Sequence, residues 1–471
     1  MTRRQKWVLG LTAIAALMVA LDTTVVTTAL TTIRLHLHAS ISQLEWTVNA
    51  YVLSFAVLLM TSAAIGDRFG RRRVFAIGLA LFSTASALCA LSPSVGWLIA
   101  ARAVQGAGAA LITPASLALL SAAFPPEKRG QALGLYGGIT GLAVVAGPVI
   151  GGAITQGLAW QWVFWLNVPI GLAAIPFVLR GMDESFGERA KLDVAGLLLV
   201  TGAALGVVWG LVRGNTAGWG SVEVLATLAG GTVLALAFVA WGLRAREPML
   251  PMRLFRSRGF AAGNAVTILM SGALFSAVFF VAQFEQTTLG SSPLQTGLRL
   301  IPWTGTVFIV APISGALVPR VGERALIVAG LLLQALGFGW VALLARTGLP
   351  YAETIPPLIL AGVGVSLALP AGQTAVMNGV TRGELGKASG TFSTMRQLGA
   401  ALGLALAVAV FSGAGSYASP AAFSDGFAAA LAVSAGLSLC GALAGIALRG
   451  RRRVDSVAGG SAVPALAAER A

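Results

Sequence analysis

Charged residues are scarce in this chain of 471 residues. Only 10% of the residues are Asp, Glu, Lys or Arg, 56% are apolar, and the mean hydropathy is +0.84. Because soluble domains carry about 25% charged residues, the composition excludes an ordinary soluble globular protein. It predicts helices that face lipid or one another, since helices satisfy their own backbone hydrogen bonds inside a lipid bilayer.

Cysteine and histidine are rarer still, with two residues of each type. Both cysteines, Cys89 and Cys440, lie inside apolar stretches, which excludes a disulfide framework and a metal site of the usual spacing. The sequence contains no nucleophile–base pair and no phosphate-binding loop, so we expect neither an enzyme nor a bound cofactor. The formal net charge of +15 does not indicate nucleic-acid binding, because the basic residues form short clusters between apolar stretches.

Fourteen apolar stretches follow one another along the chain. Each is about 20 residues long, the length that crosses a hydrocarbon core of ~30 Å. Their approximate limits are residues 8–30, 44–65, 74–92, 97–119, 131–155, 161–180, 192–213, 221–243, 259–283, 296–318, 325–345, 354–377, 388–412 and 425–448. We therefore predict an all-α, polytopic membrane protein with 14 transmembrane helices.

The basic residues are distributed unevenly over this predicted topology. With the N-terminus in the cytoplasm, 26 of the 32 Lys and Arg residues fall in cytoplasmic segments and 4 in external ones. The remaining two, Arg102 and Arg396, lie inside spans. Because short cytoplasmic loops carry the excess of Lys and Arg, we expect a protein of the cell membrane with both termini in the cytoplasm.

An internal repeat relates the first and last parts of the chain. The run that begins at Gly106 recurs from Gly362, and Gly147 recurs as Gly403 at the same offset of 256 residues. Two parallel halves around a site at the midplane are a design of alternating-access transporters. The predicted organisation is an N-terminal six-helix half at 1–190, a two-helix insert at 191–245, a C-terminal six-helix half at 246–450 and a disordered cytoplasmic tail at 451–471.

Four local patterns are more specific than apolar character. The loop after the second span reads Ile-Gly-Asp-Arg-Phe-Gly-Arg-Arg-Arg at 65–73, and the fourth span carries Arg-Ala-Val-Gln-Gly-Ala-Gly from Arg102. The fifth span reads Ala-Gly-Pro-Val-Ile-Gly-Gly at 146–152, and the first reads Leu-Asp-Thr-Thr-Val-Val-Thr-Thr-Ala-Leu at 21–30. In combination these motifs resemble the major facilitator superfamily, and specifically its fourteen-span drug:proton antiporter branch.

Other segments are similar to the same branch, and some positions depart from its pattern. Further matches lie at 46–51, 162–171, 292–302 and 396–403. The departures are Ala63 and Ala143, where the family has glycine, Thr27, where it has asparagine, and Thr31, where it has proline. The resemblance covers residues from about 15 to 412 and implies a fourteen-helix bundle of the major facilitator fold.

The loop at 65–73 is expected to gate the cytoplasmic side. The resemblance assigns this role to Asp67, Arg68, Gly70 and Arg71. Acids and bases at helix ends can pair with one another and with helix dipoles of the other half, and such contacts break when that side opens. An ordinary basic loop on the cytoplasmic side is the alternative interpretation.

The motif of the fifth span resembles one that is shared by antiporters of the superfamily. Its glycines allow helices to approach closely and its proline allows a bend. The residues concerned are Gly147, Pro148, Gly151 and Gly152. We therefore expect export rather than uptake, although generic packing of small residues explains the same pattern.

A charged residue deep inside a span costs several kcal/mol to insert into the membrane. Each such residue is therefore a candidate functional residue. At about 1.5 Å per residue, Asp22 lies about 21 Å from the cytoplasmic edge and Arg102 about 8 Å from the outer edge. These heights nearly coincide, so we expect the two residues to interact and to carry proton coupling. A static buried pair that orients two helices is the alternative.

A substrate cavity is expected at the midplane, between the two halves. The candidate lining residues are Asp22, Tyr51, Gln105, Glu285, Arg396 and Gln397. Arg396 either lines this cavity or binds helix carbonyls, and Glu285 either recruits cations or is a solvated loop acid. Glu45, by contrast, is explained as a favourable charge at a helix N-terminus.

The sequence thus predicts a proton-coupled antiporter that exports small, lipophilic organic molecules such as drugs or antibiotics. Its expected partners are the substrate, protons and the lipid bilayer, without nucleic acid, and a monomer is compatible with the sequence. Two alternatives remain open. The first is a uniporter or importer of a metabolite without proton coupling, and the second is a membrane sensor that no longer transports.

Overall fold

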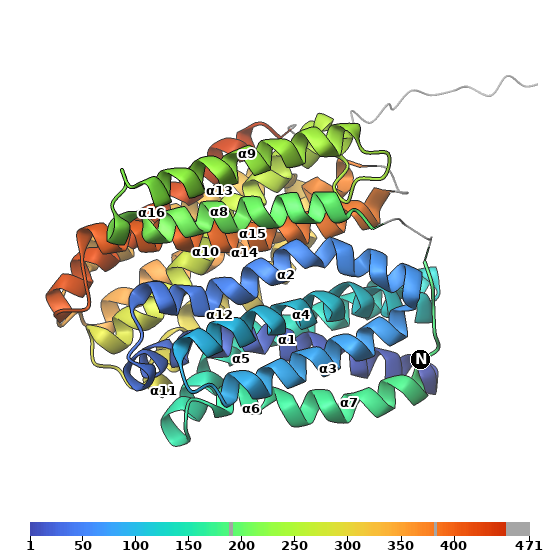
Figure 1. The fold of residues 1–471 in the computed structure, drawn as a ribbon, viewed down its shortest axis with the longest axis horizontal. Coiled ribbons are helices and arrows are strands. Elements are labelled where there is room, and N and C mark those ends of the chain that lie inside the picture. Colours follow the sequence, from blue (N-terminus) through green and yellow to red (C-terminus); the bar gives the residue numbers. More distant parts are fainter. Residues whose placement is uncertain (188–191, 381–383, 449–471) are drawn as a thin grey trace, which may run out of the picture.

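The computed structural model describes residues 1–187, 192–380 and 384–448, which form helices joined by short connections and contain no strand. The expected tail at 451–471 lies outside the described residues. Figure 1 shows long helices lying side by side in one bundle. Thirteen helical rods in the described part are long and apolar enough to cross a membrane. A further helix of 32 residues lies where the fifth span is expected, so the all-α prediction is confirmed, whereas the count of fourteen spans stays a prediction.

The helices fall into three consecutive groups. The first group consists of α1 (Arg3–Leu37), α2 (Ile41–Phe69), α3 (Arg71–Ala90), α4 (Val95–Ala123), α5 (Pro126–Gly157), and the broken rod of α6 (Trp162–Trp165) and α7 (Asn167–Gly181). The second group is α8 (Val194–Ala217) and α9 (Val222–Arg244). A short 3-10 helix (Met252–Arg256) leads to the third group, which is α10 (Arg258–Thr287), α11 (Pro293–Arg299) with α12 (Ile301–Val321), α13 (Glu323–Leu344), α14 (Tyr351–Asn378), α15 (Leu385–Ala414) and α16 (Pro420–Ile446).

Helix starts follow local capping chemistry. Thr2, Ser40 and Ser292 each accept a hydrogen bond from the backbone of the third helical residue, whose glutamine side chain binds back to the cap. Such capping boxes satisfy backbone donors that have no partner in the first turn. Asp193 caps α8 in the same sense, through the backbone nitrogen of Gly196. Polar residues in the connections therefore cap the starts of these four helices.

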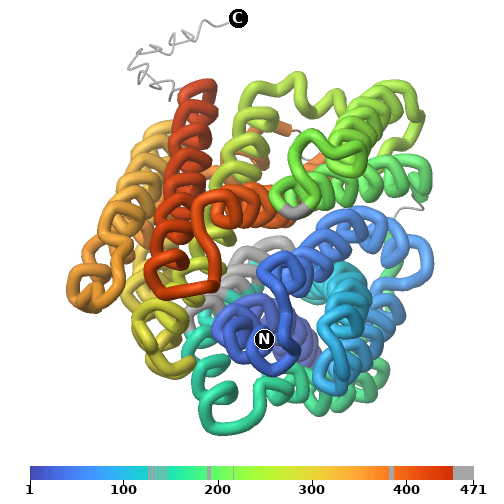
Figure 2. Tube along the Cα trace, turned by 60° about the vertical axis from the view of Figure 1, so that its left-hand side comes forward, coloured from blue at the N-terminus to red at the C-terminus, as the bar shows by residue number. Residues whose placement is uncertain are grey.

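The two six-rod groups repeat the same packing. In the first group α1 packs on α5, α2 on α4, and α3 on α4 and α7. In the third group the equivalent contacts are α10 on α15, α12 on α14, and α13 on α14 and α16. The packing thus follows the order of the internal sequence repeat, and Figure 2 shows the two groups side by side.

Two symmetric seams join these groups. One seam is α2 against α15, and the other is α5 against α11 and α12. The insert lies along only the first seam, because α8 packs on both α2 and α15 while α9 packs on α8. Asn215 of α8 donates to the carbonyl of Ala409 on α15, and the ring of Trp209 lies 5.8 Å from that of Trp46 on α2, tilted by 52°. The insert therefore contacts both halves.

Close helix crossings depend on glycine at two points of the repeat. A Cβ atom added at Gly106 would overlap the carbonyl oxygen of Tyr51 on α2, and one added at Gly403 would overlap the Cα of Gly272 on α10. Small residues at such crossings let backbones approach closely, which is the usual way helices pack inside a membrane.

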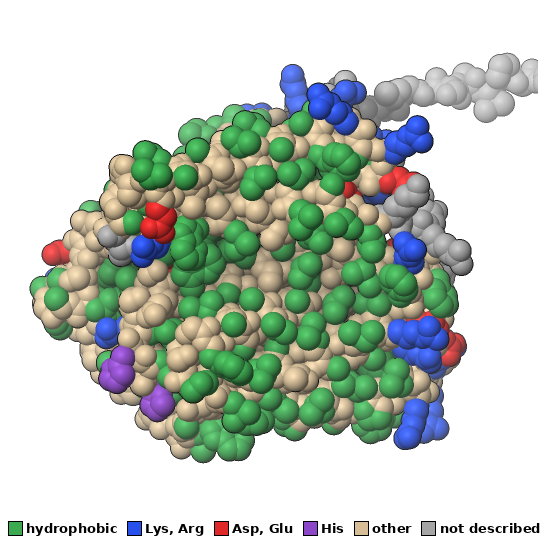
Figure 3. Space-filling model, viewed as in Figure 1, with side chains coloured by type: hydrophobic (Ala, Val, Ile, Leu, Met, Phe, Trp, Pro, Cys, Tyr) green, Lys and Arg blue, Asp and Glu red, His purple; other side chains and the backbone are tan. Residues whose placement is uncertain are grey.

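Charge gathers at one end of the bundle. Figure 3 shows most of the visible Lys and Arg side chains at the end where the N-terminus lies, while apolar side chains cover the flank. We call this the basic end, and it includes the connection between α2 and α3. The end that carries His36 and His38, between α1 and α2, is the opposite end.

Candidate functional site

Asp22 lies near the middle of α1, with 1% of its surface exposed. Its carboxylate accepts hydrogen bonds from Arg102 Nη1 at 2.5 Å, Gln105 Nε2 at 2.8 Å and Asn167 Nδ2 at 3.2 Å. The two charged residues whose similar heights suggested an interaction are therefore in direct contact. Because a buried carboxylate needs an opposite charge and hydrogen bonds to offset desolvation, the arginine and the two amides compensate for the burial of Asp22.

Arg102 of α4 is surrounded by partners on every side. Besides Asp22, it donates to Gln105 Oε1 at 2.7 Å and, through Nε, to the backbone carbonyl of Thr47 at 3.2 Å. Its guanidinium lies 4.2 Å from the ring centroid of Tyr51 and 5.7 Å from that of Phe164. A cation over an aromatic face is attracted by the ring quadrupole, so the positive charge is compensated by α1, α2 and α4 together.

Two further residues complete this polar cluster and were not assigned a role from the sequence. Asn167, the first residue of α7, donates to Asp22 and to Ser86 Oγ of α3 at 3.2 Å. Ser86 in turn donates to the carbonyl of Phe164 at 2.8 Å. Asn167 stands in one of the segments that resemble the family, which was an available signal, whereas Ser86 is an ordinary serine in an apolar helix.

The cluster lies inside the N-terminal half. Tyr51 and Gln105, which the sequence placed at a substrate cavity, are fully buried between α2, α3 and α4. Because α3 and α7 contribute Ser86 and Asn167, Asp22 points toward the core of its own half. Asp22, Tyr51 and Gln105 therefore belong to one enclosed cluster within this half.

Two buried glutamines offer a matched test of this network. Gln105 Nε2 donates to Asp22 and Ser86, and its Oε1 accepts from Arg102. In Gln334 of α13, also fully buried, neither amide atom has a partner in the described part of the chain. We expect Gln105→Met to lower the free energy of unfolding by about 1–3 kcal/mol, because it removes hydrogen bonds to both charges.

Gln334→Met is the control, since methionine has a similar length and no polar group is left unpaired. It should leave the free energy of unfolding unchanged or raise it. The measurement is the unfolding transition of the purified protein in detergent, followed by tryptophan fluorescence. Equal effects of the two substitutions would contradict the role of Gln105 in this network.

Arg396 lies on α15, in the other half, and is half-buried. Its Nε has no partner, and no hydrogen bond or ion pair of its guanidinium is found among the described residues. The neighbouring Gln397 is 4% exposed. Neither residue meets Asp22, so the sequence-predicted lining residues separate into a cluster at Asp22 and a second group at Arg396.

Glu285, near the end of α10, is 2% exposed. Its Oε2 accepts from Arg299 Nη1 at 2.8 Å and from Ser291 Oγ at 2.9 Å. Arg299 also lies 5.1 Å from the ring of Tyr351 on α14. Glu285 is thus neither a solvated acid nor a neighbour of Asp22, and it ties α10 to α11 and α14 at the opposite end.

The loop motif at the basic end makes contacts within its own half. Asp67 Oδ1 accepts from Arg71, with Nε at 2.8 Å and Nη2 at 2.7 Å, and its backbone carbonyl accepts from the nitrogen of Gly187. Arg68 lies 5.4 Å from the ring of Phe69. The expected pairing of the motif's own charges is present, but no contact with the other half is found among the described residues.

Glu184 is the partner of this loop that the sequence did not reveal. Its Oε1 accepts from the backbone nitrogen of Arg72 at 2.8 Å, and its Oε2 lies 3.7 Å from Arg73 Nε. Gly70 has a φ of 105°, which favours glycine, and a Cβ there would collide with the Glu184 carboxylate. The segment after α7 therefore docks onto the loop that begins α3.

The motif of α5 makes two kinds of contact. Within the N-terminal half, a Cβ at Gly147 would overlap the Thr24 side chain of α1, and one at Gly151 would approach the Val25 carbonyl oxygen to 2.6 Å. The second kind crosses between the halves. A Cβ at Gly152 would overlap the carbonyl of Pro293, and one at Gly297 of α11 would overlap the carbonyl of Pro148. The same motif thus positions α1 and holds α11.

Other contacts join the halves at the opposite end. Gln286 Nε2 of α10 donates to the carbonyl of Thr28 on α1 at 3.0 Å. Arg34, near the end of α1, lies 4.1 Å from the ring of Tyr417 in the α15–α16 connection. With the α5–α11 contact, these interactions close the seam between the halves at that end.

Glu45 is a buried acid whose environment the sequence did not indicate. It is the fifth residue of α2 and is fully buried. Asn49 Nδ2 donates to its Oε1 at 2.9 Å, while Oε2 has no partner in the described structure. Glu45 thus lies close to the N-terminus of α2, as expected, and the structure adds that α2 begins against the packed helices of the bundle.

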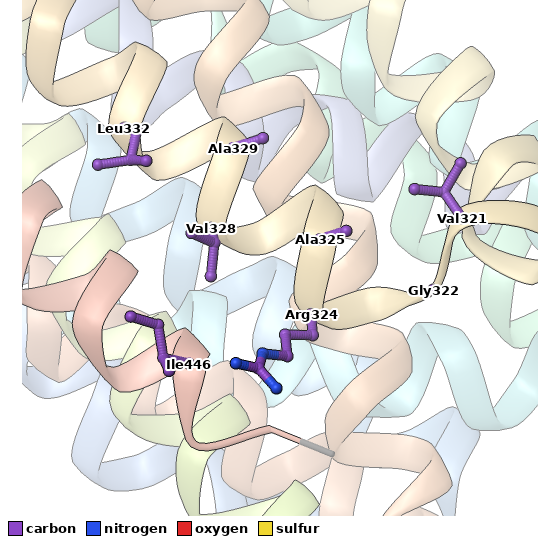
Figure 4. Close-up of a pocket in the computed structure, with 8 residues that line it drawn as sticks. All are labelled: Val321, Gly322, Arg324, Ala325, Val328, Ala329, Leu332 and Ile446. Carbon is purple, nitrogen blue, oxygen red and sulfur yellow. The ribbon is translucent and has the colours of Figure 1, made fainter. Parts of the chain in front are cut away.

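The pocket in Figure 4 lies away from these residues, at the basic end. It is formed by α13, the connection before it and the end of α16. Its lining residues are Val321, Gly322, Arg324, Ala325, Val328, Ala329, Leu332 and Ile446. It contains no acid and does not touch Asp22. Among the described residues no group of three or more His, Cys, Asp or Glu side chains is arranged to hold a metal.

Long apolar rods in two equivalent groups, with a buried ion pair at mid-height, define a multi-pass membrane transporter. The family model of the Major Facilitator Superfamily matches residues 12–404 and, a second time, 265–467. The chain belongs to the major facilitator superfamily, as its motifs predicted. Among solved structures, a POT family transporter in complex with 5-aminolevulinic acid has the same fold, with a TM-score of 0.70 and 14% identity over 92% of this chain and 94% of that one.

Two curated relatives come from actinobacteria. The Tetracenomycin C resistance and export protein of Streptomyces glaucescens is 36% identical over 397 residues, which cover 84% of this chain and 73% of the relative. The Puromycin resistance protein pur8 of Streptomyces alboniger is 34% identical over 480 residues, which cover 98% of this chain and 94% of the relative.

Proposed function

We propose that this protein exports small, lipophilic organic molecules such as antibiotics across the cytoplasmic membrane, in exchange for protons. The observation that carries the proposal is Asp22, a carboxylate at mid-height of the bundle whose partners are one arginine and two amides. A charge at this depth is costly to keep. A carboxylate that binds and releases a proton in each transport cycle would explain why the charge is retained.

Export is supported by two further observations. The relatives named above are resistance and export proteins, and α5 carries the motif that resembles antiporters, with contacts to both α1 and α11. The basic end would face the cytoplasm by the distribution of Lys and Arg. The closed seam at the opposite end then corresponds to a conformation that receives substrate from the cytoplasm.

The proposed coupling runs through Arg102. Protonation of Asp22 removes its negative charge, and the contact with Arg102 then weakens because only hydrogen bonding remains. Arg102 also holds the carbonyl of Thr47 on α2, and α2 packs against α15 of the other half. A shift of the guanidinium is therefore transmitted to a seam between the halves. Release of the proton restores the ion pair and resets the transporter.

The alternative is a uniporter in which the Asp22–Arg102 pair only orients two helices. The complete set of partners around Arg102 is compatible with that structural role. The two functions differ in one measurable property, because a uniporter does not respond to a proton gradient.

The test uses everted membrane vesicles that contain the protein, with a panel of cationic, neutral and anionic fluorescent dyes. We expect uptake of at least one dye when the vesicle interior is acidified, and loss of that uptake when an ionophore collapses the gradient. Vesicles without the protein are the control. Uptake of the same rate with and without the gradient would favour the uniporter.

A further inference from the structure

The two arginines inside the bundle have opposite environments. Arg102 binds a carboxylate, an amide oxygen, a backbone carbonyl and an aromatic ring. Arg396 has no hydrogen-bond or ion-pair partner among the described residues, although its Nε is buried. Guanidinium groups are always charged in proteins, and an unpaired buried charge is costly. Arg396 is therefore ready to bind an acceptor that the chain itself does not supply.

No acid of the described helices can reach Arg396 at its height. Arg396 is near the middle of α15, and Asp22 is the one acid in the middle part of a described helix. Asp22 is already bound to Arg102. Every other acid of these helices lies within two turns of a helix end or at a cap. The buried charges at mid-height therefore leave one positive charge in excess.

Arg396 lies on a helix that takes part in the interface between the halves. α15 packs against α2 of the other half. Met60 of α2, Tyr136 of α5 and Met395 of α15 are partly buried side chains packed against one shared hydrophobic cluster. This region joins both halves, which is where transporters of this architecture bind substrate.

We infer that Arg396 binds an acidic oxygen of the substrate, so that the preferred substrates are lipophilic organic anions. The inference rests on the proposed export function and specifies its substrate class. The planar fork of the guanidinium matches a carboxylate or a delocalised phenolate. The partly buried apolar side chains of the hydrophobic cluster to which α15 contributes, such as Met60 and Met395, can contact the rest of the molecule. A cationic substrate would meet the excess positive charge at this height, and Asp22 is not accessible to it.

Equilibrium binding tests the inference without a proton gradient. Fluorescein and pyronin Y share a xanthene ring system, but the first is an anion and the second a cation. Their binding to the purified protein in nanodiscs of uncharged lipid is followed by fluorescence anisotropy. We expect fluorescein to bind at least about 10-fold more tightly than pyronin Y, and Arg396→Ala to weaken fluorescein binding by about 10- to 100-fold. Arg396→Lys should weaken it less, because the charge remains.

Arg346→Ala is the matched control, since Arg346 is an exposed arginine paired with Glu353 at the opposite end. It should leave the binding of both dyes unchanged. Tighter binding of pyronin Y to the wild type, no binding of either dye, or fluorescein binding that survives Arg396→Ala in a folded protein would overturn the inference. If Arg396→Ala does not fold, the inference is tested by the wild-type protein alone, through the ratio of its affinities for fluorescein and pyronin Y. Failure of the proposed function would give a different result. Fluorescein would still bind, but dye uptake into vesicles would have the same rate with and without the proton gradient.

Discussion

Asp22→Asn is expected to abolish proton-driven uptake into everted vesicles and to lower the free energy of unfolding by about 3–5 kcal/mol. The transport effect follows from the loss of the protonatable group. The stability effect follows because Arg102 remains buried with a full positive charge and no carboxylate. The two effects are measured separately, by dye uptake under a gradient and by the unfolding transition in detergent.

A double variant separates stability from function. Asp22→Asn together with Arg102→Met removes both charges, so most of the lost stability should return, because replacing a whole buried ion pair by apolar groups is close to neutral. Transport should stay absent. The control is Glu353→Gln at the exposed Arg346–Glu353 pair. We expect this change to lower the free energy of unfolding by no more than about 1 kcal/mol. Gradient-driven uptake that persists in Asp22→Asn would place the proton site elsewhere, with the buried Glu45 as the next candidate.

Gly297→Val is expected to reduce the rate of efflux by about 5- to 150-fold. The added side chain would overlap the Pro148 carbonyl of α5 in the conformation that is closed at the opposite end. Overpacking of this kind costs about 1–3 kcal/mol. The conformation in which α5 and α11 separate avoids the overlap, so the population shifts toward opening of the opposite end.

Labelling of a single cysteine reads this shift directly. Gln286→Cys is introduced at the opposite end, where Gln286 contacts Thr28 across the halves, after Cys89 and Cys440 are replaced by alanine. Gly297→Val should speed its reaction with a membrane-impermeant maleimide. Gly315→Val on the same rod is the control, because a Cβ at Gly315 meets no atom within 4 Å. Normal efflux and unchanged labelling in Gly297→Val would contradict the proposed movement of α5 against α11.

The glycine motif of α5 shows how far pattern reasoning reaches. Its glycines and proline predicted close packing and antiporter character, but not which helices they contact. The structure divides them between two neighbours, with Gly147 and Gly151 against α1 and Gly152 against Pro293 of the other half. Small residues indicate that another helix packs closely against them. Which helix that is depends on the arrangement of the whole bundle.

The environments of three acids, Glu45, Glu285 and Glu184, could not be predicted from the sequence. Glu45 and Glu285 both lie close to helix ends. The sequence indicated only a favourable helix N-terminus charge for Glu45, and it left a solvated acid open for Glu285. Glu45 is buried with Asn49 as its partner, and Glu285 is bound by Arg299 and Ser291. Their burial depends on how far the neighbouring helices extend past them, and no local pattern contains that information. Glu184 was missed for the same reason, since its contact with α3 joins segments more than 100 residues apart.

The sequence by itself determined that this chain is an all-α membrane protein of the major facilitator superfamily. It also determined that Asp22 and Arg102 are the charges to examine together. Hydropathy, charge distribution and helix length carry that information, because the bilayer imposes one thickness on every span and one high cost on every buried charge. Only the tertiary structure decided that Asp22 is enclosed within the N-terminal half, while Arg396 has no hydrogen-bond or ion-pair partner among the described residues. Partners of a buried side chain come from helices distant in sequence, and their choice follows from the packing of the whole bundle.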